Sequence, residues 1–357
     1  MTMINKNDVL NILRPIQDPD LGKSIVDLGF VTNVIIDGSS VEVELTLTTP
    51  ACPVKDDFKR QAEELIMTLN GVENASCQFS SKTPATQQRP ATPGKQKLAG
   101  VDRVIAIGSG KGGVGKSTIA VNVACALSQM GVKVGLLDGD IYGPSIPLLM
   151  QTDQEPRSEG NRMIPGMAHG IPIISMGFMA QGDEPLIWRG PMAHKAISQC
   201  LFDVDWGQLD YLIVDLPPGT GDIHLTLSQT VDLDGIAIVS TPQDLGLTIS
   251  RKTLQMFRKT NVPVLGIMEN MSAFNCSNCG SEEHLFGKDI VRKSAEELKI
   301  PFLGEIPFDL TVSQTKLGQK PVVLRDAKSP ASQAITRVTE QLVRELSIIN
   351  NSQQIGV

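Results

Sequence analysis

The chain has 357 residues, of which 41% are hydrophobic, and its formal net charge is −7. This length exceeds the size at which one hydrophobic core stops growing, so we expect two domains. The acidic balance argues against nucleic acid as the main partner. We find no apolar run long enough to span a membrane and no export signal, so we expect a soluble cytoplasmic protein that has no membrane partner.

Residues 1–80 predict a small α+β domain. We expect a short helix that ends at Leu13, strands at 24–37 and 40–49 joined by a turn at 37–40, an amphipathic helix at 53–69 and a last strand at 75–79. Residues 81–100, SKTPATQQRPATPGKQKLAG, contain three prolines, no acidic residue and one large apolar residue. That composition cannot form a core, so it predicts a semi-rigid linker.

Residues 101–357 repeat a pattern of apolar strand, glycine turn and helix. Seven short runs are expected to be strands, at 103–110, 133–140, 171–179, 211–219, 235–242, 264–270 and 301–308. Strands that alternate with helices predict a parallel sheet that is covered on both faces. Ligands of such folds bind at the carboxyl ends of the strands.

The strongest motif follows the first of these strands and opens a helix. It is GKGGVGKST, here called the phosphate loop, and it fits G-x-x-x-x-G-K-[ST]. The loop consists of Gly110, Lys111, Gly112, Gly113, Val114, Gly115, Lys116, Ser117 and Thr118. Its glycines allow backbone N–H groups to turn toward phosphate, Lys116 meets the β and γ phosphates, and Ser117 meets Mg²⁺. The motif predicts ATP or GTP binding.

Carboxylates follow two other strands. Asp215 ends an apolar strand beside the phosphate loop, where a Mg²⁺ contact through water is needed. Asp138 and Asp140 end another strand, where a carboxylate can order the attacking water or hold a Mg²⁺-bound water, or can cap a helix or turn. Lys111 is a second lysine within the loop. It is either a solvated surface charge or a group that reaches the phosphates of a nucleotide on a facing subunit.

Two cysteines lie three residues apart in the segment NCSNCGSEEH. Six cysteines are too few for a disulfide scaffold, so Cys276 and Cys279 predict metal binding or redox work. With His284 and Asp289 they make the spacing C-x2-C-x4-H-x4-D, close to a zinc knuckle, so structural zinc is one alternative.

The other cysteines and histidines carry less information. Cys52 precedes a proline at the expected start of a helix, where it either caps or packs the helix or has a favoured thiolate. Cys77, Cys125 and Cys200 are expected to be buried structural thiols. His169, His194 and His224 have no partner at ligand spacing, so surface or satisfied polar positions are expected.

Several motifs together resemble one protein family. With both lysines, GKGGVGKST resembles the deviant Walker A motif of ParA, MinD and the nitrogenase iron protein. The motifs DGDIYGPSIP, DLPPGTGD, STPQDL, MENMSAFNCSNCG and GEIPFD resemble the Mrp/ApbC (Nbp35-like) iron–sulfur cluster carrier ATPases over residues 101–345. The segments DPDLGKSIVDLGFV and TPACPVKDDF resemble the MIP18-like (DUF59) domain found before such ATPases, and Cys52 matches its cysteine.

The resemblance implies an α/β fold, a parallel-sheet P-loop NTPase of the MinD/ParA type preceded by a small α+β domain. It implies a homodimer that sandwiches ATP and hydrolyses it slowly, with Lys111 acting in trans. Asp140 matches the first switch and Asp215 to Asp222 the second. Asn270 and the stretch 306–309, which includes Pro307, match positions that contact adenine. Ser117 and, through water, Asp215 would hold Mg²⁺.

The resemblance also makes Cys276 and Cys279 the ligands of an iron–sulfur cluster. A [4Fe–4S] cluster takes four thiolates, and a two-fold dimer doubles the pair, so a labile cluster would bridge two subunits and pass to apo iron–sulfur proteins, with cluster-assembly factors as further partners. The alternative is a MinD/ParA-like spatial switch with a structural zinc site, and an electron-transferring reductase is a third class. A switch of this kind that binds membranes requires a basic amphipathic C-terminus. Residues 333–349 have mixed charges and a helical stripe at Ile335, Val338, Leu342 and Leu346, which predicts a core-packing helix.

Overall fold

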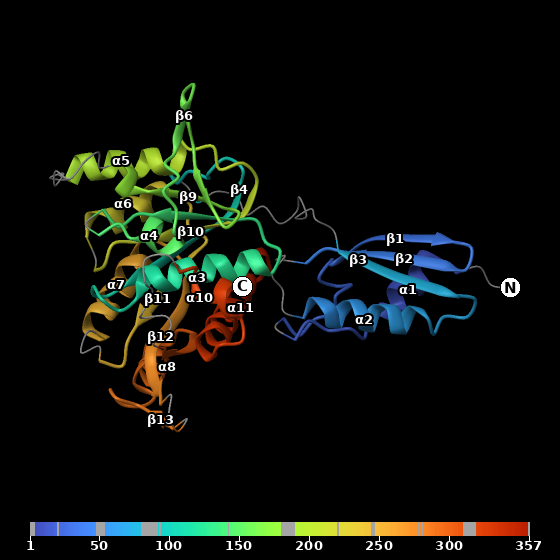
Figure 1. The fold of residues 1–357 in the computed structure, drawn as a ribbon. Coiled ribbons are helices and arrows are strands. Elements are labelled where there is room, and N and C mark those ends of the chain that lie inside the picture. The colour runs from blue at the N-terminus through green and yellow to red at the C-terminus, as the bar shows by residue number, and fades with distance from the viewer. Residues whose placement is uncertain are drawn as a thin grey trace. The chain divides into compact units, whose positions relative to one another are not determined.

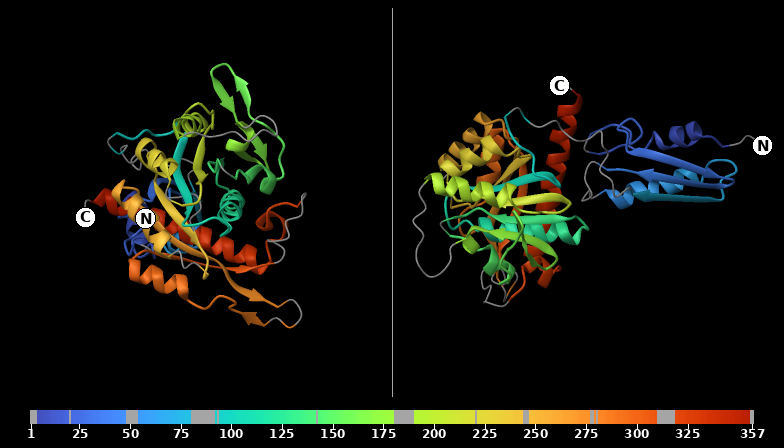
Figure 2. Two further views of the ribbon diagram at one scale, coloured as in Figure 1. Left: turned by 90° about the vertical axis from the view of Figure 1, so that its left-hand side faces the viewer. Right: turned by 90° about the horizontal axis from the view of Figure 1, so that it is seen from above.

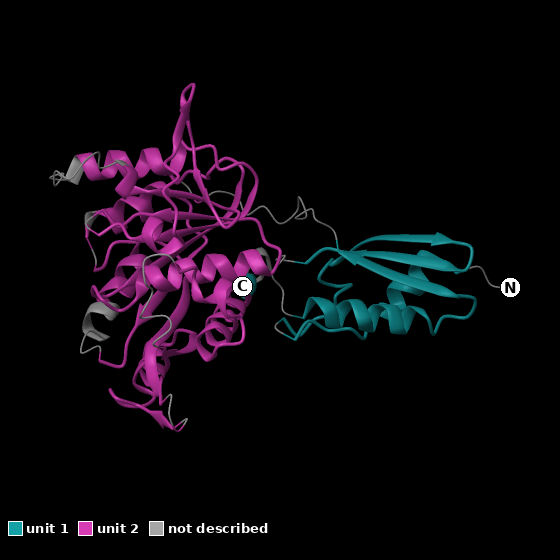
Figure 3. Ribbon diagram, viewed as in Figure 1, with its two compact units in different colours: residues 1–89, 347–357 teal, residues 90–346 magenta. Residues whose placement is uncertain are grey.

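A computed structural model describes residues 4–19, 21–47, 54–79, 92, 94–141, 143–179, 190–219, 221–243, 247–276, 279, 281–309 and 319–355. The chain divides into two compact units (Figure 3). Unit 1 comprises Met1–Arg89 and Ser347–Val357, and unit 2 comprises Pro90–Leu346. None of the described helices is both long enough and apolar enough to cross a membrane.

The described residues before Arg89 in unit 1 form a three-stranded sheet and two helices, and the end of α11 (Pro330–Ile355) also belongs to this unit. In chain order its elements are α1 (Lys6–Leu13), β1 (Val31–Asp37), β2 (Ser40–Leu45), α2 (Lys55–Ile66) and β3 (Asn74–Phe79). The strand order is β1-β2-β3, with β1 antiparallel and β3 parallel to β2. Both helices bury apolar side chains, Val9 and Leu13 from α1 and Phe58, Ala62 and Ile66 from α2, in the same core as β2. The predicted α+β arrangement is therefore present.

The first strand of unit 1 is shorter than predicted. Ser24 forms an isolated antiparallel bridge with Gln17, and residues 25–29 form turns, with Leu28 N donating to Ser24 O and Gly29 in the left-handed region at φ 72°. Ile25 and Phe30 are nevertheless buried in the core. Their apolar character suggested a strand because a run of apolar residues predicts burial better than it predicts backbone conformation. Cys52 lies outside the described residues.

Unit 2 is built on a nine-stranded sheet of order β13-β12-β11-β4-β10-β5-β9-β8, with β14 also paired to β12. Its strands are β4 (Val101–Ser109), β5 (Val134–Asp138), β8 (Gly166–Ala168), β9 (Ile171–Ser175), β10 (Leu209–Asp215), β11 (Gly235–Ser240), β12 (Val264–Asn275), β13 (Glu282–Glu283) and β14 (Phe302–Phe308). All the pairings are parallel except those of β8 and β13. The α/β fold class with a mostly parallel sheet is confirmed.

All seven strands predicted for this region are present, with changed ends. β9 stops at Ser175, and the chain continues as a 3₁₀ turn, η2 (Met176–Met179). β12 runs five residues beyond the predicted end at Asn270, to Asn275. The short strands β8 and β13 and the separate hairpin of β6 (Arg157–Glu159) with β7 (Arg162–Ile164) were not predicted. Strands of two or three residues are too short to show a periodic pattern.

Helices lie on both faces of this sheet (Figures 1 and 2). They are α3 (Lys116–Gln129), α4 (Ile146–Met150), α5 (Gly190–Phe202), α6 (Asp222–Thr230), α7 (Leu247–Lys259), α8 (Ile290–Leu298), α10 (Val322–Arg325) and α11 (Pro330–Ile355). The predicted stripe of α11 is buried at all four positions, each at most 2% exposed. This helix therefore packs into a core, as predicted.

The end of the proline-rich segment belongs to unit 2. Leu98 is buried in the core of this unit, and Gln96 forms a parallel bridge with Val231. Thr92 Oγ1 donates to Asp232 Oδ1 over 2.7 Å. Residues 92 and 94–100 are thus attached to unit 2 by specific contacts, so the linker predicted at 81–100 does not extend over them.

Candidate functional site

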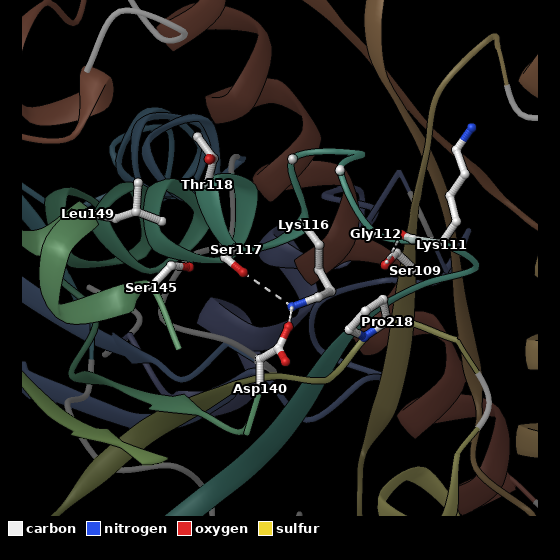
Figure 4. A pocket seen from close by; sticks show the side chains of 12 residues that line it. Ser109, Lys111, Gly112, Lys116, Ser117, Thr118, Asp140, Ser145, Leu149 and Pro218 are labelled. Atoms are coloured by element: carbon white, nitrogen blue, oxygen red, sulfur yellow. Dashed lines mark hydrogen bonds and ion pairs between the residues drawn. The ribbon is translucent and has the colours of Figure 1, made fainter. Parts of the chain in front are cut away.

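The phosphate loop connects β4 to α3 and lines a pocket of about 300 Å³ (Figure 4). Gly113 and Gly115 both have φ of 82°, in the left-handed region that favours glycine. The pocket is lined by Ser109, Lys111, Gly112, Gly113, Gly115, Lys116, Ser117, Thr118, Asp140, Ser145, Leu149 and Pro218. The loop motif, the first switch and the second switch predicted from the sequence therefore meet at one cavity, at the carboxyl ends of the strands.

A buried ion pair lies at the base of this pocket. Lys116 Nζ is 2.5 Å from Asp215 Oδ1, 3.2 Å from Ser117 Oγ and 3.8 Å from Asp140 Oδ2. Burial raises the pKa of Asp215, whereas the charge of Lys116 acts in the opposite direction. The second oxygen, Asp215 Oδ2, is buried and has no hydrogen-bond partner. A buried carboxylate oxygen without a protein partner indicates a bound ion or water at this position.

Asp138 uses its carboxylate differently. Oδ2 accepts from Ser145 N, Ile146 N and Ser175 Oγ at 2.9 to 3.1 Å, and Oδ1 accepts from Asp140 N at 3.2 Å. Burial, and then the nearby charge of Asp215, raise the pKa of Asp138 to about 7. These bonds tie the end of β5 to the start of α4, which places Asp140 on the pocket. A nucleotide contact from Asp138 itself stays a prediction.

Asn270 contacts the phosphate loop directly. Its Nδ2 donates to Val114 O over 2.9 Å, and a Cβ on Gly115 would collide with the same nitrogen. Pro307 follows Ile306, which is paired with Asn270 across β12 and β14. The structure thus places the two predicted base-contacting positions on neighbouring strands, and the adenine contact itself stays a prediction.

Lys111 and Lys116 point in different directions. Figure 4 shows the amine of Lys116 directed toward Ser117 and Asp140, while the side chain of Lys111 extends away from them. The backbone oxygen of Lys111 accepts from Ser109 Oγ over 3.0 Å, which holds the backbone at the start of the loop. The side chain of Asp222, at the end of the second switch, lies outside the described part of the chain.

The cysteine pair lies between β12 and β13. We call residues 264–283 the cysteine hairpin, and it extends from unit 2 (Figures 1 and 2). Cys276 is partly exposed and Cys279 is exposed. Hydrogen bonds from Ser281, and then from the Cys276 thiol, lower the pKa of Cys279. A lowered pKa favours the thiolate, which is the form that binds metal.

The zinc-knuckle spacing does not produce a site within one chain. Both ring nitrogens of His284 face protein oxygens, Nδ1 at 3.1 Å from Ser272 O and Nε2 at 2.9 Å from Glu282 Oε1. Asp289 lies at the start of α8, 3.6 Å from Arg292 Nε. Among the residues described, no three His, Cys, Asp or Glu side chains gather so as to hold a metal ion.

Two buried titratable residues were missed from the sequence. His224 is fully buried in α6, with its ring edge-on to Phe257, and burial lowers its pKa to about 4, so of the two expected positions, surface or satisfied polar, the surface one is excluded for it. Glu269 is 1% exposed and paired across strands with Glu305. A charged residue in the apolar run VLGIMEN was the available signal for Glu269. The expected burial of Cys77, Cys125 and Cys200 is confirmed.

Comparisons with known protein families match both units. A model of the NUBPL iron-transfer P-loop NTPases matches residues 100–343, and one described as iron-sulfur cluster assembly protein matches residues 6–77. A Synechocystis protein named "Iron-sulfur cluster carrier protein" is 43% identical over 354 residues, 97% of this chain and 99% of that protein. The mouse "Iron-sulfur cluster transfer protein NUBPL" is 47% identical over 257 residues, 71% of this chain and 81% of that protein.

Solved structures give the same fold. A nucleotide-binding protein from Archaeoglobus fulgidus in complex with ADP is 36% identical, with a TM-score of 0.54 over 67% of this chain and 88% of that one. MinD in the MinC:MinD complex of Aquifex aeolicus is 21% identical, with a TM-score of 0.50 over 68% of this chain and 96% of that one. At that identity the likeness concerns the fold alone.

Proposed function

The chain belongs to the family of NUBPL iron-transfer P-loop NTPases, and from that premise we propose that it is an ATP-dependent iron–sulfur cluster carrier. In this proposal it holds a labile [4Fe–4S] cluster as cargo and transfers the cluster to apo-proteins. One observation carries the proposal. The same unit has a phosphate-loop pocket with a buried Lys116–Asp215 pair and an exposed cysteine pair in which the pKa of Cys279 is lowered.

ATP is the substrate of the phosphate-loop pocket in this proposal. Backbone N–H groups of residues 110–118 surround the phosphates, and the α3 N-terminus adds a favourable dipole. Lys116 binds the β and γ phosphates, which compete with Asp215 for its amine. Asp140 orients the attacking water. Asn270 and Pro307 contact adenine, as their neighbouring places on β12 and β14 support.

The residues present fit a Mg²⁺ ion. The Ser117 hydroxyl lies near the Lys116 amine, and the buried Asp215 Oδ2 is an acceptor without a protein partner. Oxygen donors of this kind suit Mg²⁺, which keeps several waters, so Ser117 would hold the ion directly and Asp215 through water. When bound, the ion neutralises charge on the phosphates.

A homodimer completes both sites in this proposal. One chain supplies two thiolates and a [4Fe–4S] cluster takes four, so Cys276 and Cys279 of two subunits would share the cluster. Lys111, whose side chain is directed away from Ser117 and Asp140, acts on the facing subunit during slow hydrolysis. We place the protein in the cytoplasm, with apo iron–sulfur proteins and cluster-assembly factors as partners.

We also propose a role for each segment of the chain. Residues 1–80 form the MIP18-like domain, the part of 81–100 that precedes unit 2 acts as the linker, and 101–357 form the ATPase with the metal site. The matching of residues 6–77 to an assembly-protein family supports a part for the first domain in receiving or delivering the cluster. Cys52 is the candidate thiol for that part, and unchanged transfer by Cys52→Ala would remove this role.

The test is the metal and sulfide content of anaerobically reconstituted protein. We expect about four irons and four acid-labile sulfides per dimer, with broad visible absorbance. The Cys276→Ser, Cys279→Ser double variant should lose both, and Cys77→Ala, which removes a buried thiol of unit 1, should keep both. Stoichiometric zinc without sulfide would instead support the ATP-driven dimer switch with a structural zinc site.

A further inference from the structure

Strand β12 contains a bulge between the phosphate loop and the cysteine pair. Asn270 is paired with Ile306 and Phe274 with Phe308, so three residues of β12, Met271–Ala273, lie opposite one residue of β14. Met271 has a φ of 58°, in the left-handed region that a side chain of this size rarely adopts. Such a bulge interrupts the ladder while the paired residues on both sides stay in place.

One end of the bulge contacts the phosphate loop. Asn270 Nδ2 donates to Val114 O over 2.9 Å. The Cε atom of Met271 lies 3.9 Å from the position that a Cβ on Gly115 would occupy. Asn270 therefore bonds to the backbone of the phosphate loop, and the end of the Met271 side chain lies close to Gly115.

The other end of the bulge leads to the loop between Cys276 and Ser281, here called the cysteine loop. Asn275 is paired with Glu282, and Cys276 N donates to Ser281 O over 2.9 Å, which closes the loop that carries both thiols. Directly after this hairpin, His284 Nδ1 lies 3.1 Å from Ser272 O, within the bulge, and Nε2 lies 2.9 Å from Glu282 Oε1. His284 thus joins the bulge to the base of the cysteine loop.

We propose that Asn270 and His284 are positioning residues that couple nucleotide binding at the phosphate loop to the geometry of Cys276 and Cys279, through the bulge Met271–Ala273. Nucleotide that shifts Val114 moves Asn270, the bulge takes up the change, and His284 passes it to the cysteine loop. This inference rests on the proposed function, because it gives the carrier a route by which ATP alters cluster binding. Coupling of this kind is reciprocal, so the state of the thiols also alters nucleotide affinity.

The test uses full-length, reduced, metal-free protein. The rate at which iodoacetamide alkylates Cys276 and Cys279 is followed by mass spectrometry without nucleotide, with saturating Mg-ADP and with a saturating non-hydrolysable Mg-ATP analogue. In the unmodified sequence we expect nucleotide to change this rate about fivefold or more. Alkylation of both thiols should in turn change the nucleotide Kd.

Substitutions test whether the nucleotide effect depends on Asn270 and His284. Asn270→Ala and His284→Ala should reduce the nucleotide effect to none, at nucleotide concentrations shown by direct titration to saturate each variant. His284→Gln, whose amide can still donate to Ser272 O, should retain most of the effect. The matched control is Glu283→Gln, an exposed carboxylate of the same hairpin, which should keep the full effect.

Two results would overturn the inference. One is a thiol reactivity that no nucleotide changes in the unmodified sequence, and the other is an unchanged nucleotide effect in both Asn270→Ala and His284→Ala. His284 lies just beyond the cysteine loop, so His284→Ala keeps the test decisive if Asn270→Ala does not fold. Because the assay needs no cluster, its failure is distinct from failure of the carrier proposal, which the iron and sulfide counts decide.

Discussion

Lys116 Nζ lies 2.5 Å from Asp215 Oδ1, and this ion pair is almost completely enclosed, with 6% of the lysine side chain and none of the aspartate side chain exposed. It joins the start of α3 to the end of β10. Loss of one member of such a pair leaves a buried charge without compensation, which is more costly than replacing the pair as a whole. The two residues that would serve phosphate and Mg²⁺ are therefore also partners in the fold.

Asp215→Asn should weaken both stability and hydrolysis. The amide keeps the shape but removes the nearer of the two carboxylates beside Lys116 and leaves Asp140 Oδ2 at 3.8 Å, so we expect the free energy of unfolding to fall by about 3 kcal/mol. Phosphate release should fall at least about 100-fold, because the acceptor for Mg²⁺-bound water is lost. Urea denaturation and a phosphate-release assay measure the two effects. Asp153→Asn, at an exposed aspartate, is the control, and an Asp215→Asn protein that hydrolyses ATP normally would refute the Mg²⁺ role.

Lys111 and Lys116 should differ in a mixing experiment. Lys116→Ala should lose nucleotide binding, whereas Lys111→Ala should bind nucleotide but fail to hydrolyse it. If Lys111 acts in trans, a 1:1 mixture of the two inactive variants contains mixed dimers with one complete site each, which restores at most about a quarter of the normal rate. Phosphate release from the mixture measures this. A mixture that stays as inactive as its components would place Lys111 on its own subunit's nucleotide.

Gly115→Ala and Gly112→Ala should have different effects on stability. Gly115 has a φ of 82°, and its Cβ would collide with Asn270 Nδ2, whereas a Cβ on Gly112 would have no atom within 4 Å. We expect Gly115→Ala to lower the free energy of unfolding by about 2 kcal/mol or more, through the left-handed conformation and the displaced Asn270 amide. Gly112→Ala should stay within about 0.5 kcal/mol of the original value. Equal effects in chemical denaturation would contradict the close approach of Asn270.

Glu269 should make the stability depend on pH. Burial, and then the charge of Glu305, raise its pKa from the usual 4.5 to about 7. A carboxyl whose pKa is higher in the folded than in the unfolded state stabilises the fold most below pH 4.5, and this contribution is lost as the pH rises to about 7. The loss amounts to at most about 3 kcal/mol.

Glu269→Gln should remove this contribution. The stability of the variant minus that of the original chain should be larger at pH 8 than at pH 5.5, because the glutamine amide does not ionise. The free energy of unfolding in urea at the two pH values measures the difference. Glu283→Gln, at an exposed glutamate, should leave the pH dependence as it is, and the same result for Glu269→Gln would show that Glu269 ionises normally.

Local patterns in the sequence were sufficient to predict most of the framework. The seven strands of the parallel sheet were found because each is a short apolar run between turn residues. The buried stripe of α11 followed from helical spacing. Residues 24–30 were mistaken for strand because Ile25 and Phe30 are buried although neither lies in a strand. His224 was missed because its burial depends on the neighbouring helix, through Phe257.

The phosphate loop and the cysteine pair could be recognised from the sequence alone, because both are contiguous motifs of characteristic residue types. How their side chains are held depends on the fold. Lys116 and Asp215 are 99 residues apart, and Asn270 and Val114 are 156 apart. Contacts at such separations depend on how strands are ordered in the sheet, which no local pattern encodes. For the same reason the sequence did not show that Asp138 accepts hydrogen bonds from protein groups or that His284 lies beside Ser272 O. Both contacts depend on which backbone groups the fold brings within reach.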